Sequence, residues 1–294
     1  EMRIWRLIED ISRSGSFNMA ADQVLLENYS RDSYPVFRVY DWECPTLSLG
    51  RNEKLDRHID LEVCSNLGIP VVRRTTGGKA VLHGFDLTYS LVGGVLDQNF
   101  NGGVLDNYRF LAQGFYAFFK KLGLKPELQE RSRKKKKTDP HVCFAEPSAY
   151  EILVEGRKII GSAQRIRNLR GPDTSSYRVF LQHGSIPLND SVPIIAQIFP
   201  YSREENLRND MHSLESAGIY PELSKQELRQ QLAIYYAMIE NLDENIGRLM
   251  DTLNRSPVFR ENTLVVYFSD HGDFMGSHDA FCRKSHPQEE SIRI

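Results

Sequence analysis

The 294-residue chain has no excess of charge of either sign, few cysteines and no long apolar run. Its formal net charge is −2, so nucleic acid and membrane surfaces are not expected as partners. The scattered cysteines form no C-x-x-C pair, which argues against a disulfide framework or a zinc site and for free thiols in the cytoplasm. They are Cys44, Cys64, Cys143 and Cys282. The start, EMRIWRLIED, lacks the apolar core of a signal peptide.

Strand-like and helix-like patterns alternate through the first two thirds of the chain. Residues 3–8 predict a strand. Residues 16–30 predict an amphipathic helix capped by Ser16, with a stripe that includes Met19, Val24 and Leu25. Further elements are expected at 35–42, 46–50, 59–68, 69–94, 107–124, 148–166 and 180–188. Because the pattern has no regular βαβ period, we expect an α+β fold with a mixed sheet.

The character of the sequence changes near residue 200, where we expect a boundary between a domain of residues 1–200 and a segment of residues 201–294. Residues 201–218 are polar and weakly patterned. A long helix is predicted over 224–256, with Ser224 and Glu227 as a capping box. A strand is predicted over 262–270. We expect this later segment to dock loosely on the first domain.

The stretch RRTTGGKAVLH, residues 73–83, places two arginines before adjacent glycines and a histidine after them. Gly77 and Gly78 permit a tight turn with positive φ and a close approach of a ligand to the backbone. The exposed N–H groups of such a turn can hold a carbonyl or phosphate oxygen. An ordinary hairpin turn would also explain the two glycines.

RRTTGGKAVLHGFDLTYS resembles the signature of the lipoate–protein ligase and octanoyltransferase family, which shares its fold with biotin protein ligases. The resemblance extends over residues 3–190 and includes SFNMAADQVLL, PTLSLGR, CFAEPSAYEILVEGRKIIGSAQ and LQHGSIPL. It implies a biotin/lipoate protein ligase-like mixed sheet with flanking helices. Lys79 and Gly84 depart from the residues that many members carry at these positions.

The resemblance also implies roles for individual residues. Lys158 matches the lysine that lies against the acyl carbonyl, where an ammonium group stabilises the developing oxyanion. Without the family, Lys158 would be interpreted as a solvated hairpin lysine. The residues expected to bind substrate are Arg73, Arg74, Gly77, Gly78, His83, Gly161, Ser162 and His183.

Cys143 lies in the pattern C-F-x-x-P-S-x-Y-E, which resembles the LipM-type octanoyltransferase branch of the family. The resemblance implies that octanoyl moves from acyl carrier protein to the Cys143 thiolate. It then moves to a lysine of a carrier domain, either the H protein or a dehydrogenase lipoyl domain, without a cofactor. A reactive thiolate needs nearby positive charge, which Lys158 could supply with help from His83 or His141. A buried inert cysteine is the structural alternative.

The basic run RKKKK, residues 133–137, precedes Cys143. It is either a solvated loop or a surface that steers acidic carrier proteins, in which case binding should weaken with salt.

The sequence SDHGDFMGSH, residues 269–278, resembles the C-terminal part of the sulfatase family, and the resemblance covers residues 201–294. It implies metal ligation by Asp270 and His271 and a sulfate contact by Lys284. The C-x-P-x-R motif of that family is absent, so we expect no sulfatase activity and at most weak Ca²⁺ binding. The chain then resembles a chimera of natural, engineered or artefactual origin.

Three alternatives to the octanoyltransferase hypothesis follow from these patterns. An ATP-dependent lipoate–protein ligase would use ATP and Mg²⁺, with the Gly77–Gly78 turn and Lys158 at the phosphates. A metal-dependent sulfuric or phosphoric ester hydrolase would use Asp270, His271 and Lys284. A non-catalytic scaffold would result if the junction near residue 200 disrupted the acyl pocket.

Overall fold

A computed structural model describes most of the first 233 residues and a few isolated positions beyond them. The described ranges are 5–30, 33–55, 58–94, 104–129, 151–170, 176–220 and 223–233, with 250–251, 254–255 and 260. Several sequence predictions lie outside the described residues. They concern Cys143, His141, the basic run 133–137, the strand 262–270, Asp270, His271 and Lys284.

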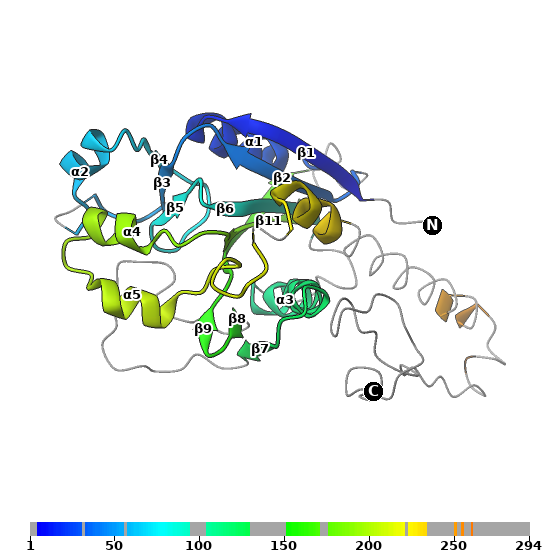
Figure 1. The fold of residues 1–294 in the computed structure, drawn as a ribbon. Coiled ribbons are helices and arrows are strands. Elements are labelled where there is room, and N and C mark those ends of the chain that lie inside the picture. Colours follow the sequence, from blue (N-terminus) through cyan, green and yellow to red (C-terminus); the bar gives the residue numbers. More distant parts are fainter. Residues whose placement is uncertain are drawn as a thin grey trace, which may run out of the picture.

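A five-stranded sheet forms the centre of the molecule, in the order β1-β2-β6-β11-β10 (Figure 1). Its strands are β1 (Arg6–Arg13), β2 (Val36–Trp42), β6 (Asp86–Gly94), β10 (Gly161–Arg170) and β11 (Ser176–Pro187). β1 and β2 pair in parallel, whereas the other neighbours pair antiparallel. The predicted mixed sheet is therefore confirmed.

Two smaller sheets flank the central one. The first has the order β4-β3-β5 and the second the order β7-β8-β9. Their strands are β3 (Thr46–Leu49), β4 (Val71–Arg73), β5 (Val81–His83), β7 (Pro126–Gln129), β8 (Glu151–Val154) and β9 (Arg157–Lys158). Glu155 and Gly156 form the turn of the hairpin between β8 and β9, and both have positive φ, 51° and 74°. Two-residue hairpin turns of the favoured type require positive φ at both positions.

The helices are α1 (Gly15–Glu27), α2 (Leu61–Asn66), α3 (Val104–Lys121), α4 (Val192–Ile198) and α5 (Glu204–Asp210). Figure 1 shows α1 and α3 on opposite sides of the central sheet. The cap of α1 is Ser14, whose hydroxyl accepts from the Phe17 N–H at 3.3 Å. The prediction of Ser16 as the cap was wrong, because Ser16 lies inside the first helical turn.

Alternation directs successive side chains of the central strands to the two faces of the sheet, and the face under α1 carries both polar and apolar side chains. On β2, Phe37 and Val39 join the core that contains Phe115 and Phe118 of α3. Successive side chains of a strand point to opposite faces. Arg38 therefore faces the other side of the sheet, where its guanidinium meets α1.

The buried face of α1 is unusually polar. It consists of Gly15, Asn18, Met19, Asp22 and Leu26, whereas Val24 is 55% exposed. The predicted apolar stripe was correct for Met19 but wrong for Val24. The reason is that α1 covers a polar face of the sheet, so Asn18 and Asp22 turn inward to meet it.

Residues after 200 pack into the same cores as the residues before them. Leu207 and Met211 join the cluster around α2 and α4, while Leu214, Leu228 and Leu232 join the main core. The helix at 225–233 begins at the predicted capping box. There the Ser224 N–H donates to Glu227 Oε2 at 2.8 Å, and the Glu227 N–H donates to Ser224 Oγ at 3.3 Å. A boundary at residue 200 would cut through both cores.

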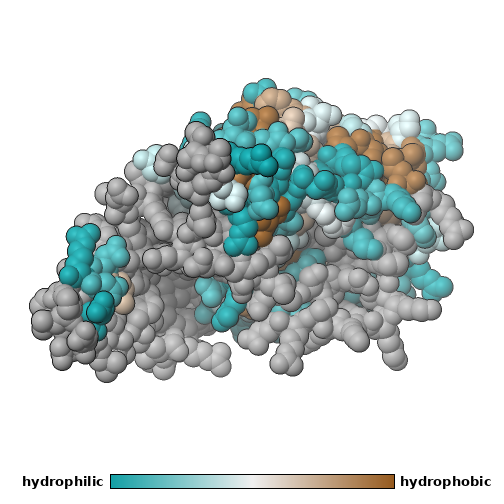
Figure 2. All heavy atoms as spheres, turned by 180° about the vertical axis from the view of Figure 1, so that it is seen from behind, coloured by the Kyte–Doolittle hydropathy of each residue, from teal (hydrophilic) through white to brown (hydrophobic). Residues whose placement is uncertain are grey.

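Some apolar side chains are exposed among the residues that the structure describes. Leu7 and Ile11 of β1 and Phe17 of α1 are between 45% and 63% exposed. Figure 2 shows apolar surface separated by hydrophilic side chains on the face behind that of Figure 1. In the part of the chain that the structure describes, no helix combines the length and the apolar character needed to cross a membrane.

Candidate active site

A row of buried polar side chains crosses the central sheet beneath α1. Arg38 of β2 lies opposite Ser90 of β6, and Ser90 lies opposite His183 of β11. Directly opposite residues of adjacent strands share one face of a sheet. Strand register therefore brings together three polar residues that are far apart in the sequence.

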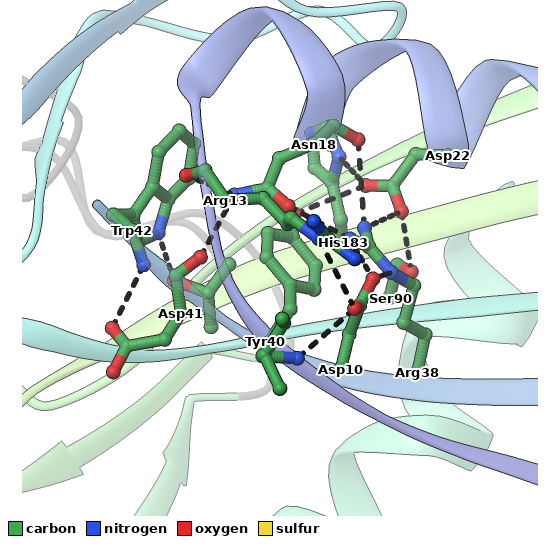
Figure 3. Close-up of polar contacts among 12 residues, drawn as sticks. Asp10, Arg13, Asn18, Asp22, Arg38, Tyr40, Asp41, Trp42, Ser90 and His183 are labelled. Atoms are coloured by element: carbon green, nitrogen blue, oxygen red, sulfur yellow. Dashed lines mark hydrogen bonds and ion pairs between the residues drawn. The ribbon is translucent and has the colours of Figure 1, made fainter.

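The carboxylate of Asp22, on α1, forms polar contacts with all three residues of this row (Figure 3). Its Oδ1 accepts from Arg38 Nη1 at 2.9 Å and from Ser90 Oγ at 2.8 Å. Its Oδ2 accepts from the Tyr40 hydroxyl at 3.0 Å and lies 3.4 Å from His183 Nδ1. A buried carboxylate needs several such donors, because loss of water is costly for a charged group.

The charges in this cluster are fixed by burial and by the neighbouring groups. Burial raises the pKa of Asp22, but the hydrogen bond and charge of His183 and the charge of Arg38 bring it below its ordinary value. Burial lowers the pKa of His183 despite the opposing effect of Asp22, and the charge of Arg74 lowers it further. At neutral pH the cluster therefore holds an ionised Asp22 beside a neutral His183.

A second histidine–carboxylate pair lies close by. His83 Nδ1 is 2.8 Å from Asp86 Oδ2, and His83 Nε2 is 2.9 Å from Ser48 Oγ. The indole of Trp42 stacks on the His83 ring with centroids 4.3 Å apart and planes 13° apart. Burial raises the pKa of Asp86, but the charge and hydrogen bond of His83 lower it to about 2. The carboxylate is thus ionised, and the imidazole is held in one orientation.

Both histidines line a small pocket that opens to solvent and has a cavity volume of about 20 Å³. Its floor includes Gly161 and Ser162 of β10, and Ser162 Oγ is 2.8 Å from the Tyr89 hydroxyl. The complete lining is Met19, Tyr40, Ser48, Arg74, Val81, His83, Thr88, Gly161, Ser162, Ala163, His183, Gly184 and Ser185. Five of the eight residues expected to bind substrate therefore meet at one place: Arg74, His83, Gly161, Ser162 and His183.

The other three lie in or beside the glycine turn next to the pocket. Gly78 has a φ of 91°, a backbone conformation that favours glycine. Arg74 Nη2 donates to the carbonyls of Gly77 at 2.8 Å and Lys79 at 2.6 Å. Arg73 Nη1 donates at 2.7 Å to the Gly50 carbonyl. The two guanidinium groups hold the backbone around the pocket, a function that the sequence did not suggest.

Lys158 is almost fully buried, at 2% exposed, and its Nζ donates to Glu151 Oε1 at 2.5 Å. The interpretation of Lys158 as a solvated hairpin lysine is therefore wrong. Lys158 ends β9, three residues before Gly161 of the pocket floor. Sequence reasoning gave no role to Glu151, although this residue ends the pattern C-F-x-x-P-S-x-Y-E.

Several pocket and support residues were not predicted, namely Asp22, Arg38, Ser48 and Asp86. Arg38 offered a signal, since a charge in the middle of the apolar strand PVFRVYDW requires a buried partner. Ser48 and Asp86 offered none, because a serine or an aspartate near a strand end is common. Among the described residues, no group of three or more His, Cys, Asp or Glu side chains could hold a metal ion.

Comparison with known proteins gives a consistent match. The family model of the lipoyl protein ligase A/B catalytic domain matches residues 14–234. Octanoyltransferase LipM of Carboxydothermus hydrogenoformans is 39% identical over 231 residues, which cover 77% of this chain and 81% of the relative. Octanoyltransferase LipM of Staphylococcus aureus is 38% identical over 206 residues, which cover 68% and 71%.

Solved structures share the fold at low sequence identity. A bipartite lipoate protein ligase from Thermoplasma acidophilum superimposes with a TM-score of 0.63 at 16% identity, covering 92% of this chain and 100% of the other. A lipoate-protein ligase A bound with ATP gives 0.62 at 18% identity, covering 81% and 85%. The sulfatase resemblance of residues 201–294 finds no support in these comparisons, and the family match continues past residue 200 into this segment.

Proposed function

The chain belongs to the lipoyl protein ligase A/B catalytic-domain family, and we propose that it is an acyltransferase that moves octanoyl groups in lipoate biosynthesis. The observation that carries this proposal is the 39% identity to an octanoyltransferase LipM over 81% of that relative. The octanoyl donor is acyl carrier protein. The acceptor is a lysine amine of a lipoyl-carrier protein, the H protein or a dehydrogenase lipoyl domain.

The transfer uses two exchanges at the Cys143 sulfur. In the first, the Cys143 thiolate attacks the thioester carbonyl of octanoyl-acyl carrier protein, and the thiolate of the carrier leaves. In the second, the lysine amine attacks the new thioester, the C–S bond breaks and an amide forms. Splitting one acyl transfer into two steps is the usual advantage of a covalent nucleophile. Neither step requires ATP or a metal ion.

Lys158 is the cation proposed to stabilise the thiolate and the oxyanion. Its burial supports this assignment, because a charge acts more strongly in a site that excludes water. Its contact with Glu151 holds the ammonium in place. The acyl group is proposed to bind beside the pocket under α1, where Gly161 and Ser162 belong to the lining.

Carrier recognition is proposed to depend on charge. Acyl carrier protein and lipoyl domains are typically acidic, and the basic run 133–137 lies close to Cys143 in the sequence. Opposite charges accelerate association and make it sensitive to salt. Scattered cysteines, of which Cys44 and Cys64 are free thiols, support a cytoplasmic site of action.

Intact-mass spectrometry tests the proposal directly. The wild-type protein and Cys143→Ser are each mixed with octanoyl-acyl carrier protein. We expect one added octanoyl group on the wild type only, and hydroxylamine should remove it. A folded wild-type protein that gains no octanoyl group would refute the cysteine mechanism. Activation of free octanoate or lipoate that consumes ATP would then identify a ligase instead.

A further inference from the structure

Ser48, His83 and Asp86 form a continuous hydroxyl–imidazole–carboxylate chain at the pocket wall. Ser48 Oγ lies 2.9 Å from His83 Nε2, and His83 Nδ1 lies 2.8 Å from Asp86 Oδ2. The three residues come from β3, β5 and the first position of β6, and all are buried. Ser48 and His83 line the pocket, while Asp86 lies behind them.

The hydrogen-bond partners decide where the protons lie. The ionised Asp86 carboxylate can only accept, and it also receives the Gly84 N–H at 2.9 Å and the Thr88 hydroxyl at 2.8 Å. His83 Nδ1 must therefore carry a hydrogen, which leaves Nε2 as the acceptor. Arg74 Nη1 donates to Ser48 Oγ at 3.2 Å. The Ser48 hydrogen can point toward His83 Nε2 at 2.9 Å, since its other acceptor, the Val81 carbonyl, lies farther away at 3.5 Å.

The other histidine of the pocket is less suited to accept a proton. His183 Nδ1 faces Asp22, whose charge is shared with Arg38, and its Nε2 is bound to Thr76 Oγ1. Burial lowers the pKa of His183, and so does the charge of Arg74. By contrast, the carboxylate of Asp86 lies directly against His83 and holds the charge that this ring would gain.

We propose that Ser48, His83 and Asp86 form a proton relay that deprotonates the carrier lysine during acyl transfer. The inference rests on the proposed octanoyltransferase function and adds a base to its second step. A lysine side chain has a pKa of about 10.4 and enters as an ammonium ion at neutral pH. It must lose a proton before it can attack a thioester.

The relay moves one proton over two hydrogen bonds. The lysine ammonium gives a proton to Ser48 Oγ while the Ser48 proton moves to His83 Nε2. The free amine then attacks the octanoyl thioester, the C–N bond forms and the C–S bond breaks. The second amine proton goes to the departing Cys143 thiolate, and His83 later releases its proton to water. Asp86 and the stacked Trp42 are positioning residues.

Other charged or titratable groups also lie close to the hydrogen-bond chain of Ser48, His83 and Asp86. Arg74 faces Ser48, His183 lies across the pocket, and Lys225 acts on Asp86 through its charge. Burial and the charge of Arg74 disfavour protonation of His183.

Single-turnover transfer from the preformed acyl-enzyme tests the relay. Ser48→Ala, His83→Gln and a control outside the pocket, His58→Gln, are loaded with octanoyl-acyl carrier protein. Each acyl-enzyme is then mixed at pH 7 with the H protein or with hydroxylamine, which is already a neutral amine. The loaded fraction of each variant is measured first, and every transfer rate is then expressed per loaded enzyme. Transfer to the H protein should fall about 10²- to 10⁴-fold in the two relay variants.

The hydroxylamine reaction separates a base from a structural support. We expect the two relay variants to lose much less rate with hydroxylamine than with the H protein, and their transfer to the H protein to rise as pH increases toward the lysine pKa. Unchanged transfer to the H protein would overturn the relay, and so would equal losses with both acceptors. Ser48→Ala removes only one buried oxygen atom. It therefore still tests the relay if His83→Gln does not fold. Failure of the wild type to load would instead refute the proposed function.

Discussion

Lys158 and Glu151 form a buried ion pair, with Nζ 2.5 Å from Oε1 and exposed fractions of 2% and 8%. Each residue neutralises the other in a part of the core where water is scarce. The pair joins β8 to β9, and the backbone carbonyl of Lys158 also accepts from the His212 N–H at 2.9 Å. The proposed catalytic lysine is therefore also part of the folded core.

Lys158→Met should destabilise the protein by about 3–5 kcal/mol, because it removes the ammonium group that pairs with the buried Glu151 carboxylate. Urea unfolding followed by circular dichroism measures this loss. The double variant Lys158→Met/Glu151→Leu should recover much of it, since no buried charge remains. A Lys158→Met protein as stable as the wild type would show that the pair does not stabilise the core.

Asp86→Asn should flatten the acid limb of the stability curve. The pKa of Asp86 is lowered to about 2 in the folded protein, so the ionised group contributes stability above the unfolded pKa of about 3.9. That stability is lost as pH falls through about 2. Because one pKa unit corresponds to about 1.4 kcal/mol, the wild type should lose roughly 2–3 kcal/mol over this window. Free energies of unfolding between pH 5 and 2 check this, and parallel curves for both proteins would contradict it.

Gly50→Ala should disturb the glycine turn, because a Cβ at Gly50 would lie 1.9 Å from the Gly78 carbonyl oxygen. Relief of this contact requires a backbone shift, and overpacking of this kind costs about 1–3 kcal/mol. Gly77→Ala is the matched control, since a Cβ there meets no atom within 4 Å. Thermal unfolding should separate the two variants. Equal midpoints would show that the turn is free to move away from Gly50.

Leu232→Ala should destabilise the whole protein, although it lies beyond the boundary expected near residue 200. Leu232 is fully buried in the main core, and removal of a buried leucine side chain costs about 2–5 kcal/mol. Leu67→Ala provides the control, because Leu67 is 46% exposed. Unfolding should remain a single transition that shifts as a whole. A wild-type midpoint for Leu232→Ala would support a separate, loosely docked C-terminal segment.

Local patterns predicted much of the fold. Strand-like patterns at 35–42 and 180–188 identified most of β2 and β11. The Ser224–Glu227 capping box lies within four residues. Such features depend on neighbours in the sequence, so the sequence is sufficient to recognise them. The order of motifs from residue 16 to residue 188 likewise identified the family.

The site required contacts that join distant segments. Ser48 and His83 are 35 residues apart, and Asp22 and His183 are 161 residues apart. Their meeting depends on strand order and register, which no local pattern encodes. Tertiary structure also changed the interpretation of α1, whose buried face was predicted to be apolar. Asn18 and Asp22 are buried because the sheet beneath them presents Arg38 and Ser90. The sequence by itself determined the elements, the family and the candidate chemistry. Only the tertiary structure, through the packing of α1 on the sheet and the register of β2, β6 and β11, decided which polar groups lose contact with water. Those groups must therefore bind one another.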